Sequence, residues 1–165
     1  MKNVSFQTRP FFLALIFVYL TIMGTPFVFA SHYELEDVPF LHEGELTKLR
    51  TAGVTSTERL LAHVAKIADR QALAAKTGIS NDRMTELAHK VDLLRVNGIG
   101  PKMVAMLQAA GVLNLKALAK EDSEALHKRV VQVNDELHIS QVVPMAGVLH
   151  GWIGQAKTLP TLLQD

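Results

Sequence analysis

The stretch Val96-Asn97-Gly98-Ile99-Gly100-Pro101-Lys102 predicts a sharp turn between two helices. Gly98 and Gly100 permit a backbone reversal because glycine tolerates positive φ, and Pro101 suits the first position of the next helix. Such a turn leaves amide groups unpaired at the positive end of the helix dipole, so it could either bind a phosphate or serve as a structural corner. The candidate phosphate-binding or nucleic-acid-binding residues are Asn97, Gly98, Ile99, Gly100 and Lys102.

An internal repeat becomes visible when the chain is shifted along itself so that Val38 lies on Val96. The other matched pairs are Leu41 with Ile99, Leu46 with Val104, Leu49 with Leu107, Ala52-Gly53-Val54 with Ala110-Gly111-Val112, and Leu60 with Leu118. Gly53 and Gly111 each follow an amphipathic run and precede valine, which is typical of a left-handed cap at a helix C-terminus. We expect two helical units, 36–94 and 95–160, in one domain over 36–160.

The two units differ at the turn. Opposite Gly98 to Lys102 stand Phe40, Leu41, His42, Glu43 and Gly44. The first turn therefore lacks both turn glycines at their positions, and its carboxylate suits a helix dipole but repels a phosphate. If either turn binds an anion, we expect it to be the second.

The whole pattern after the N-terminal segment is helical, because apolar residues recur at threes and fours and no stretch alternates strictly. Thr55-Ser56-Thr57-Glu58 has the spacing of a capping box, and Ser80-Asn81-Asp82 predicts another helix start. The expected fold class is all-α, a compact bundle of short helices.

The last helix is expected to begin near Pro144. It contains Gly147, Gly151 and Gly154 on one face, and each glycine costs a helix interior about 1 kcal/mol relative to alanine. We expect close backbone packing against another helix to compensate. Trp152, with aliphatic neighbours at helical spacing, is expected in the core rather than at a ligand.

The N-terminal segment, 1–30, has the features of a secretory signal. A basic start precedes the apolar run 11–23, and Val28 and Ala30 suit cleavage before Ser31. We therefore expect an exported protein, periplasmic or extracellular, in which the short polar stretch 31–37 is a loose leader to the first helical unit. The alternative is an uncleaved membrane anchor, because about 20 apolar residues suffice to cross a bilayer.

Charge and cysteine content exclude some classes of protein. Removing Lys2 and Arg9 from the 17 Lys and Arg residues leaves 15, against 16 Asp and Glu, so the expected mature chain has a formal charge of −1. A protein that coats nucleic acid non-specifically needs a basic surface, so this charge argues against that class of protein. The chain has no cysteine, so neither disulfides nor thiolate zinc sites can stabilise it.

Catalytic motifs are absent from the sequence. It has no cysteine nucleophile, no Gly-x-Ser-x-Gly, no phosphate-binding loop of the Gly-x-x-x-x-Gly-Lys-Ser type and no His-Glu-x-x-His, so we expect no enzyme and no cofactor. A metal site is an alternative, because Glu86-x-x-His89 and Glu124-x-x-His127 put carboxylate and imidazole on one helix face. Such pairs are also common on solvated helix faces.

Two stretches resemble known proteins. Residues 93–100, followed by Ala109-Ala110-Gly111-Val112, resemble the helix-hairpin-helix motif. The ending Gly147 to Lys157 is similar to that of a bacterial family of unknown function built from tandem helix-hairpin-helix units. The resemblance implies DNA contacts through the amides of Gly98, Ile99 and Gly100 with Lys102 nearby, although Asn97 departs from the usual apolar residue.

The resemblance leaves the partner open, since extracytoplasmic proteins with related hairpins include both DNA-uptake receptors and a lumenal subunit of photosystem II. We expect a non-enzymatic binding or scaffold protein that contacts another protein of the cell envelope. The alternative is weak, sequence-independent DNA binding through the second turn, with an affinity that falls steeply with salt.

Overall fold

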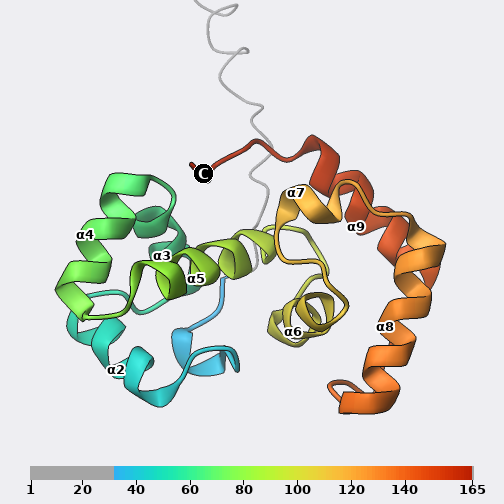
Figure 1. The fold of residues 1–165 in the computed structure, drawn as a ribbon, viewed down its shortest axis with the longest axis horizontal. Coiled ribbons are helices and arrows are strands. Elements are labelled where there is room, and N and C mark those ends of the chain that lie inside the picture. Colours follow the sequence, from blue (N-terminus) through green and yellow to red (C-terminus); the bar gives the residue numbers. More distant parts are fainter. Residues whose placement is uncertain (1–31, 165) are drawn as a thin grey trace, which may run out of the picture.

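The computed structural model describes residues 32–164, and within that range the chain is all α-helical (Figure 1). The elements are η1 (Leu35–Asp37), α2 (Glu43–Thr51), α3 (Thr57–Val64), α4 (Ile67–Thr77), α5 (Asn81–Leu93), α6 (Pro101–Ala109), α7 (Leu115–Leu118), α8 (Ser123–Leu137) and α9 (Ala146–Thr158). The expected all-α class is confirmed. The expected signal segment, 1–30, lies outside the described residues. None of the described helices has the length and apolarity needed to cross a membrane.

Backbone hydrogen bonds recur at the offset that the sequence repeat predicts. The recurring pairs are Val38 N–H to Leu35 O with Val96 to Leu93, Leu41 to Val38 with Ile99 to Val96, Gly53 to Arg50 with Gly111 to Gln108, and Val54 to Leu49 with Val112 to Leu107. Gly53 and Gly111 both have the predicted left-handed backbone, at φ 90° and 87°. The repeat weakens after this point, since α7 is only half as long as α3.

The helix start predicted at Ser80 is confirmed, and the one predicted at Thr55 is shifted by one residue. Ser80 caps α5 as predicted, accepting from the Arg83 N–H at 3.2 Å. Ser56 caps α3, one residue later than the capping box predicts, so Glu58 does not reach back to the cap. A capping box forms at α2 instead, between His42 and Glu45.

Each half of the chain has its own hydrophobic core, and α5 lies between the two halves (Figure 1). The first core centres on buried residues of α2 to α5, among them Leu49, Leu60 and Leu87. The second lies under α6 to α9 and includes Leu107 and Trp152. Apolar side chains of each half also pack against the core of the other half, so the two halves form a single packed domain.

The expected loose leader is wrong, because residues 33–37 are part of the fold. Leu35 is buried in the first core, and its N–H donates to Thr55 O at 3.0 Å. Thr57 N–H donates to Tyr33 O at 2.9 Å, while the Tyr33 ring packs against the second core. Apolar contacts at both ends of this short segment outweigh its polar composition.

The fold also continues past residue 160. After α9 the chain runs back across the molecule to α4 (Figure 1). Gln164 N–H donates to Ala65 O at 2.9 Å, its Oε1 accepts from the Ile67 N–H at 3.3 Å, and its carbonyl accepts from the buried Arg70 guanidinium. The start of α4, which lacks a side-chain cap of its own, is thereby capped from the other end of the chain.

Leu163→Ala is expected to lower the free energy of unfolding by about 2 kcal/mol, because Leu163 is only 9% exposed and lies in the first core. Leu162→Ala is the matched control, since Leu162 is 43% exposed and should cost no more than about 0.5 kcal/mol. Urea unfolding followed by far-UV circular dichroism measures both. Equal effects would mean that the tail does not pack as described.

Candidate functional site

The turn at residues 96–102 connects α5 to α6. Gly98 has φ 92°, a left-handed backbone, and the Ile99 N–H donates to Val96 O at 3.0 Å. Gly100 is the N-cap of α6 and Pro101 opens the helix. The candidate residues therefore lie together at the start of a nine-residue helix.

Helix α9 covers one side of this turn. The Gln155 side chain accepts from the Asn97 N–H at 2.8 Å and donates to Asn97 O at 3.3 Å. A Cβ at Gly98 would lie 2.9 Å from Trp152 Nε1, so only glycine fits beneath the indole. Trp152 is buried, as predicted. The Asn97 amide is thus bound within the chain, which sequence reasoning missed because Gln155 lies far along the chain.

Two backbone amides of the turn remain available. Among the described residues, Gly98 N–H and Gly100 N–H make no hydrogen bond within the chain, whereas Ile99 N–H does. The exposed Lys102 lines a hollow of about 430 Å³ next to Gly100. Asp37 lines the same hollow, so an incoming phosphate would meet a carboxylate as well as an ammonium group.

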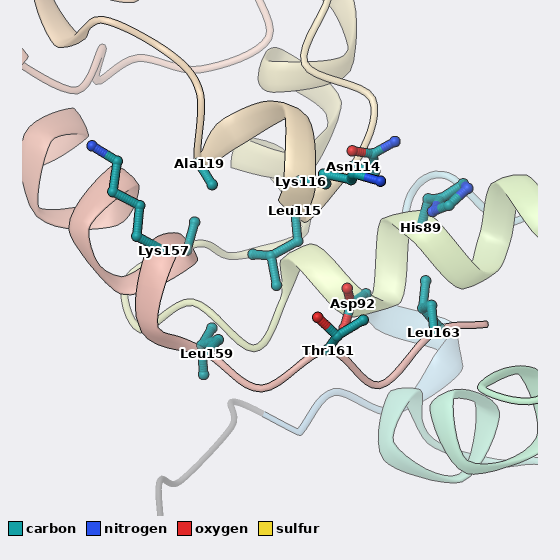
Figure 2. Close-up of a pocket in the computed structure, with 11 residues that line it drawn as sticks. His89, Asp92, Asn114, Leu115, Lys116, Ala119, Lys157, Leu159, Thr161 and Leu163 are labelled. Atoms are coloured by element: carbon teal, nitrogen blue, oxygen red, sulfur yellow. The ribbon is translucent and has the colours of Figure 1, made fainter. Parts of the chain in front are cut away.

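A cleft of about 290 Å³ lies where the two halves of the chain and the C-terminal tail meet (Figure 2). Its walls come from α5, α7, α9 and the tail. Its lining includes His89, Asp92, Asn114, Leu115, Lys116 and Leu159. No sequence pattern pointed to this cleft, because its walls are distant in the chain.

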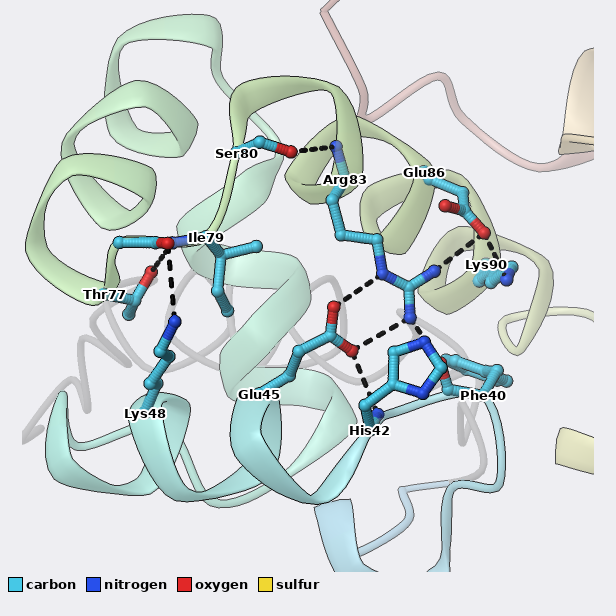
Figure 3. A network of polar contacts seen from close by, with 11 residues as sticks. Phe40, His42, Glu45, Lys48, Thr77, Ile79, Ser80, Arg83, Glu86 and Lys90 are labelled. Carbon is cyan, nitrogen blue, oxygen red and sulfur yellow. Dashed lines mark hydrogen bonds and ion pairs between the residues drawn. The ribbon is translucent and has the colours of Figure 1, made fainter.

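The first turn is closed by an ion pair (Figure 3). Glu45 accepts from Arg83 Nε at 2.7 Å, from Arg83 Nη2 at 2.9 Å, and from the His42 N–H at 3.0 Å. Arg83 Nη2 also donates to Phe40 O at 2.6 Å. The hydrogen bond from Arg83 lowers the pKa of Glu45 and, in return, raises the pKa of Arg83. An amide of this turn is therefore occupied by the chain's own carboxylate.

The two Glu-x-x-His pairs are not assembled into a metal site. Glu86 accepts from Lys90 Nζ at 2.5 Å and from Arg83 Nη1 at 2.8 Å. Burial opposes ionisation of Glu86, but these two hydrogen bonds outweigh it and lower its pKa. His127 Nδ1 lies 2.9 Å from Pro144 O. Within residues 32–164 no three His, Asp or Glu side chains are grouped so that they could hold a metal ion.

The predicted packing of the α9 glycines is wrong. Gly147, Gly151 and Gly154 are exposed, and a Cβ at any of them would meet nothing within 4 Å. Helix α9 packs on α7 and α8 through its opposite side, which carries Leu149, Trp152, Ile153 and Ala156. Its helical period leaves the glycine row facing away from the protein.

Exposed apolar side chains surround the start of this row. Val142 and Met145, just before α9, are 73% and 71% exposed, and Val148 in its first turn is also exposed. On α9 itself, Val148 borders one side of the row and the exposed His150 and Lys157 border the other. We call the row and these borders the α9 face: Gly147, Val148, His150, Gly151, Gly154 and Lys157.

Comparison with known proteins identifies a family. The family model described as Domain of unknown function (DUF4332) matches residues 40–159. No curated protein and no solved structure matches the chain. The matched range contains both turns and the whole of α9, whereas the tail residues Leu163 and Gln164 lie beyond it.

Gly98→Ala is expected to destabilise the protein by about 2–4 kcal/mol, since it combines a left-handed backbone with a clash against Trp152. Gly111→Ala is the matched control: its φ is nearly the same, but its Cβ would face open space, so about 1–2 kcal/mol is expected. Urea unfolding followed by the fluorescence of Trp152 measures both variants. Equal losses would contradict the close approach of Trp152.

Glu45→Gln is expected to lower the free energy of unfolding by about 1–3 kcal/mol at pH 7, because Arg83 loses one of its two carboxylate partners and keeps only Glu86. The folded pKa of Glu45 is lower than its ordinary value of 4.5. Its contribution is therefore complete above the ordinary value and disappears as the pH falls through the lower folded pKa. Urea unfolding at pH 7 and pH 3 measures this, with the exposed Glu43→Gln as control. An equal loss of unfolding free energy in Glu45→Gln at pH 7 and pH 3 would contradict the stabilising role of the ion pair.

Proposed function

The chain belongs to the DUF4332 family, and from its exposed surfaces we propose that it is a non-enzymatic binding protein of the cell envelope that acts through protein–protein contact. The recurrence of turn and cap hydrogen bonds in both halves supports describing them as tandem helix-hairpin-helix units. The charged start and apolar run in the segment 1–30 support export.

The α9 face is the observation that carries this proposal. Three glycines in a helix interior cost about 1 kcal/mol each relative to alanine, and the described part of the chain offers them no compensating contact. Glycine allows another backbone to approach closely. Val142, Met145 and Val148 supply exposed apolar surface at the same end, where a partner would exclude water.

The charge of α9 indicates what the partner presents. Helix α9 carries His150 and Lys157 but no Asp or Glu. A second copy of this face offers no carboxylate to pair with Lys157, so it is disfavoured as the occupant. The occupant that fits is a helix of another protein, with small or apolar side chains against the glycine row and carboxylates opposite Lys157.

DNA binding by Asn97, Gly98, Ile99, Gly100 and Lys102 is the second candidate. The unpaired amides of Gly98 and Gly100 favour it. The Gln155 contact on Asn97 and the carboxylate of Asp37 beside Lys102 oppose it. We therefore rank protein contact above DNA.

In cells that produce the chain, Gly151→Leu is expected to abolish chemical crosslinking of the protein to its partner, because a leucine would stand between the two helices. The variant should remain folded, since position 151 faces open space. Gly44→Leu, an exposed helical glycine on α2, is the matched control and should leave the crosslink unchanged. Lys157→Glu should weaken it by reversing the charge.

Loss of the crosslink in Gly151→Leu and Lys157→Glu, with retention in Gly44→Leu, supports the proposed surface. A crosslink that survives both α9 variants would contradict it. The purified chain should show no salt-dependent affinity for duplex DNA. If it did, and Lys102→Glu abolished that affinity, the second candidate would replace the first.

A further inference from the structure

We propose that the cleft between the two halves of the chain is a binding site for the carboxylate of a short aliphatic acid. The site is separate from the α9 face and from the turn at 96–102. It is walled by His89 and Asp92 of α5, by residues 114–119 around α7, by the end of α9, and by residues 159–163 of the tail.

The charges around the cleft favour an anion. His89, Lys116 and Lys157 line it, and none of these three side chains has an ion pair or hydrogen bond within the described chain. The carboxylate of Asp92 is 2.6 Å from Arg95 Nη1, and both side chains are buried. Since that ion pair cancels the only negative charge in the lining, the remaining groups leave an excess of positive charge.

One end of the cleft collects hydrogen-bond donors. Figure 2 shows the Lys116 ammonium group, the Asn114 amide and the His89 ring at the same end. Asn114 Oδ1 accepts from Ala117 N–H at 2.8 Å, which leaves its amide NH₂ to donate. An ammonium group and an amide are suitable donors for a carboxylate.

Away from this end most of the lining is apolar, and its polar members are Asp92, Thr161 and Lys157. Leu115 points into its middle and Leu159 lies toward the other end (Figure 2). Ala119 and Ala156 add to this apolar wall, whereas Leu163 lies near His89 at the donor end (Figure 2). The aliphatic chain of a ligand whose carboxylate lies near Lys116 would therefore run over Leu115, and its apolar carbons would be removed from water.

The volume limits the ligand. About 290 Å³ is just below the usual range for small-molecule sites, so the cleft takes a short acid rather than a long lipid. The same chemistry occurs in a free short-chain fatty acid and in the C-terminal aliphatic residue of a peptide. Both present one carboxylate next to a few apolar carbons.

The test is an NMR titration of the purified chain with hexanoate, with hexanamide as the neutral control. Saturable shifts of the backbone signals of His89, Asn114 and Lys116 are expected with hexanoate, and at least about tenfold weaker binding with hexanamide. Lys116→Met should weaken hexanoate binding about tenfold. Lys128→Met, on the exposed part of α8 outside the cleft, should leave it unchanged.

His89→Gln serves as a second variant, so that a folding defect in Lys116→Met does not decide the result. N-acetyl-alanyl-leucine and its C-terminal amide form a second pair of probes. Tighter binding of the dipeptide acid than of hexanoate identifies a peptide C-terminus as the source, and the reverse order identifies a free acid. Absence of saturable binding, equal binding of acids and amides, or equal loss in Lys128→Met would overturn the proposal.

Discussion

The contact between α9 and the turn at Gly98 is the constraint from which the functional surfaces follow. Gln155 binds both backbone groups of Asn97, and Trp152 lies where a side chain at position 98 would have to be. This contact fixes which side of α9 is buried. The opposite side, with its three glycines, must then face outward, and the amides of the turn are available only in part.

A second constraint joins the two halves of the chain. Tyr33 and Phe40 of the first half pack against the second core, while Leu163 of the tail lies in the first core. Because each half is completed by a segment from the other, the junction is held in one arrangement. The cleft lined by His89, Lys116 and Leu159 exists only at this junction, so neither half could form it alone.

Local features were predictable because they depend on neighbouring residues. The caps at Gly53, Ser80 and Gly111 follow from backbone conformation and from short side-chain contacts. The glycine row of α9 was misjudged for the opposite reason. Helical period puts the three glycines on one face, but it does not say whether that face is covered.

The sequence by itself determined that this chain is helical, that its two parts share one pattern, and where the glycine turn at 96–102 lies, since these depend on φ preferences and apolar period among close neighbours. Tertiary structure alone decided that Gln155 occupies the Asn97 amide, that Gln164 caps α4, and that a basic cleft opens between the halves. These contacts join residues tens of positions apart, and the packing of apolar side chains, which no local pattern encodes, selects them.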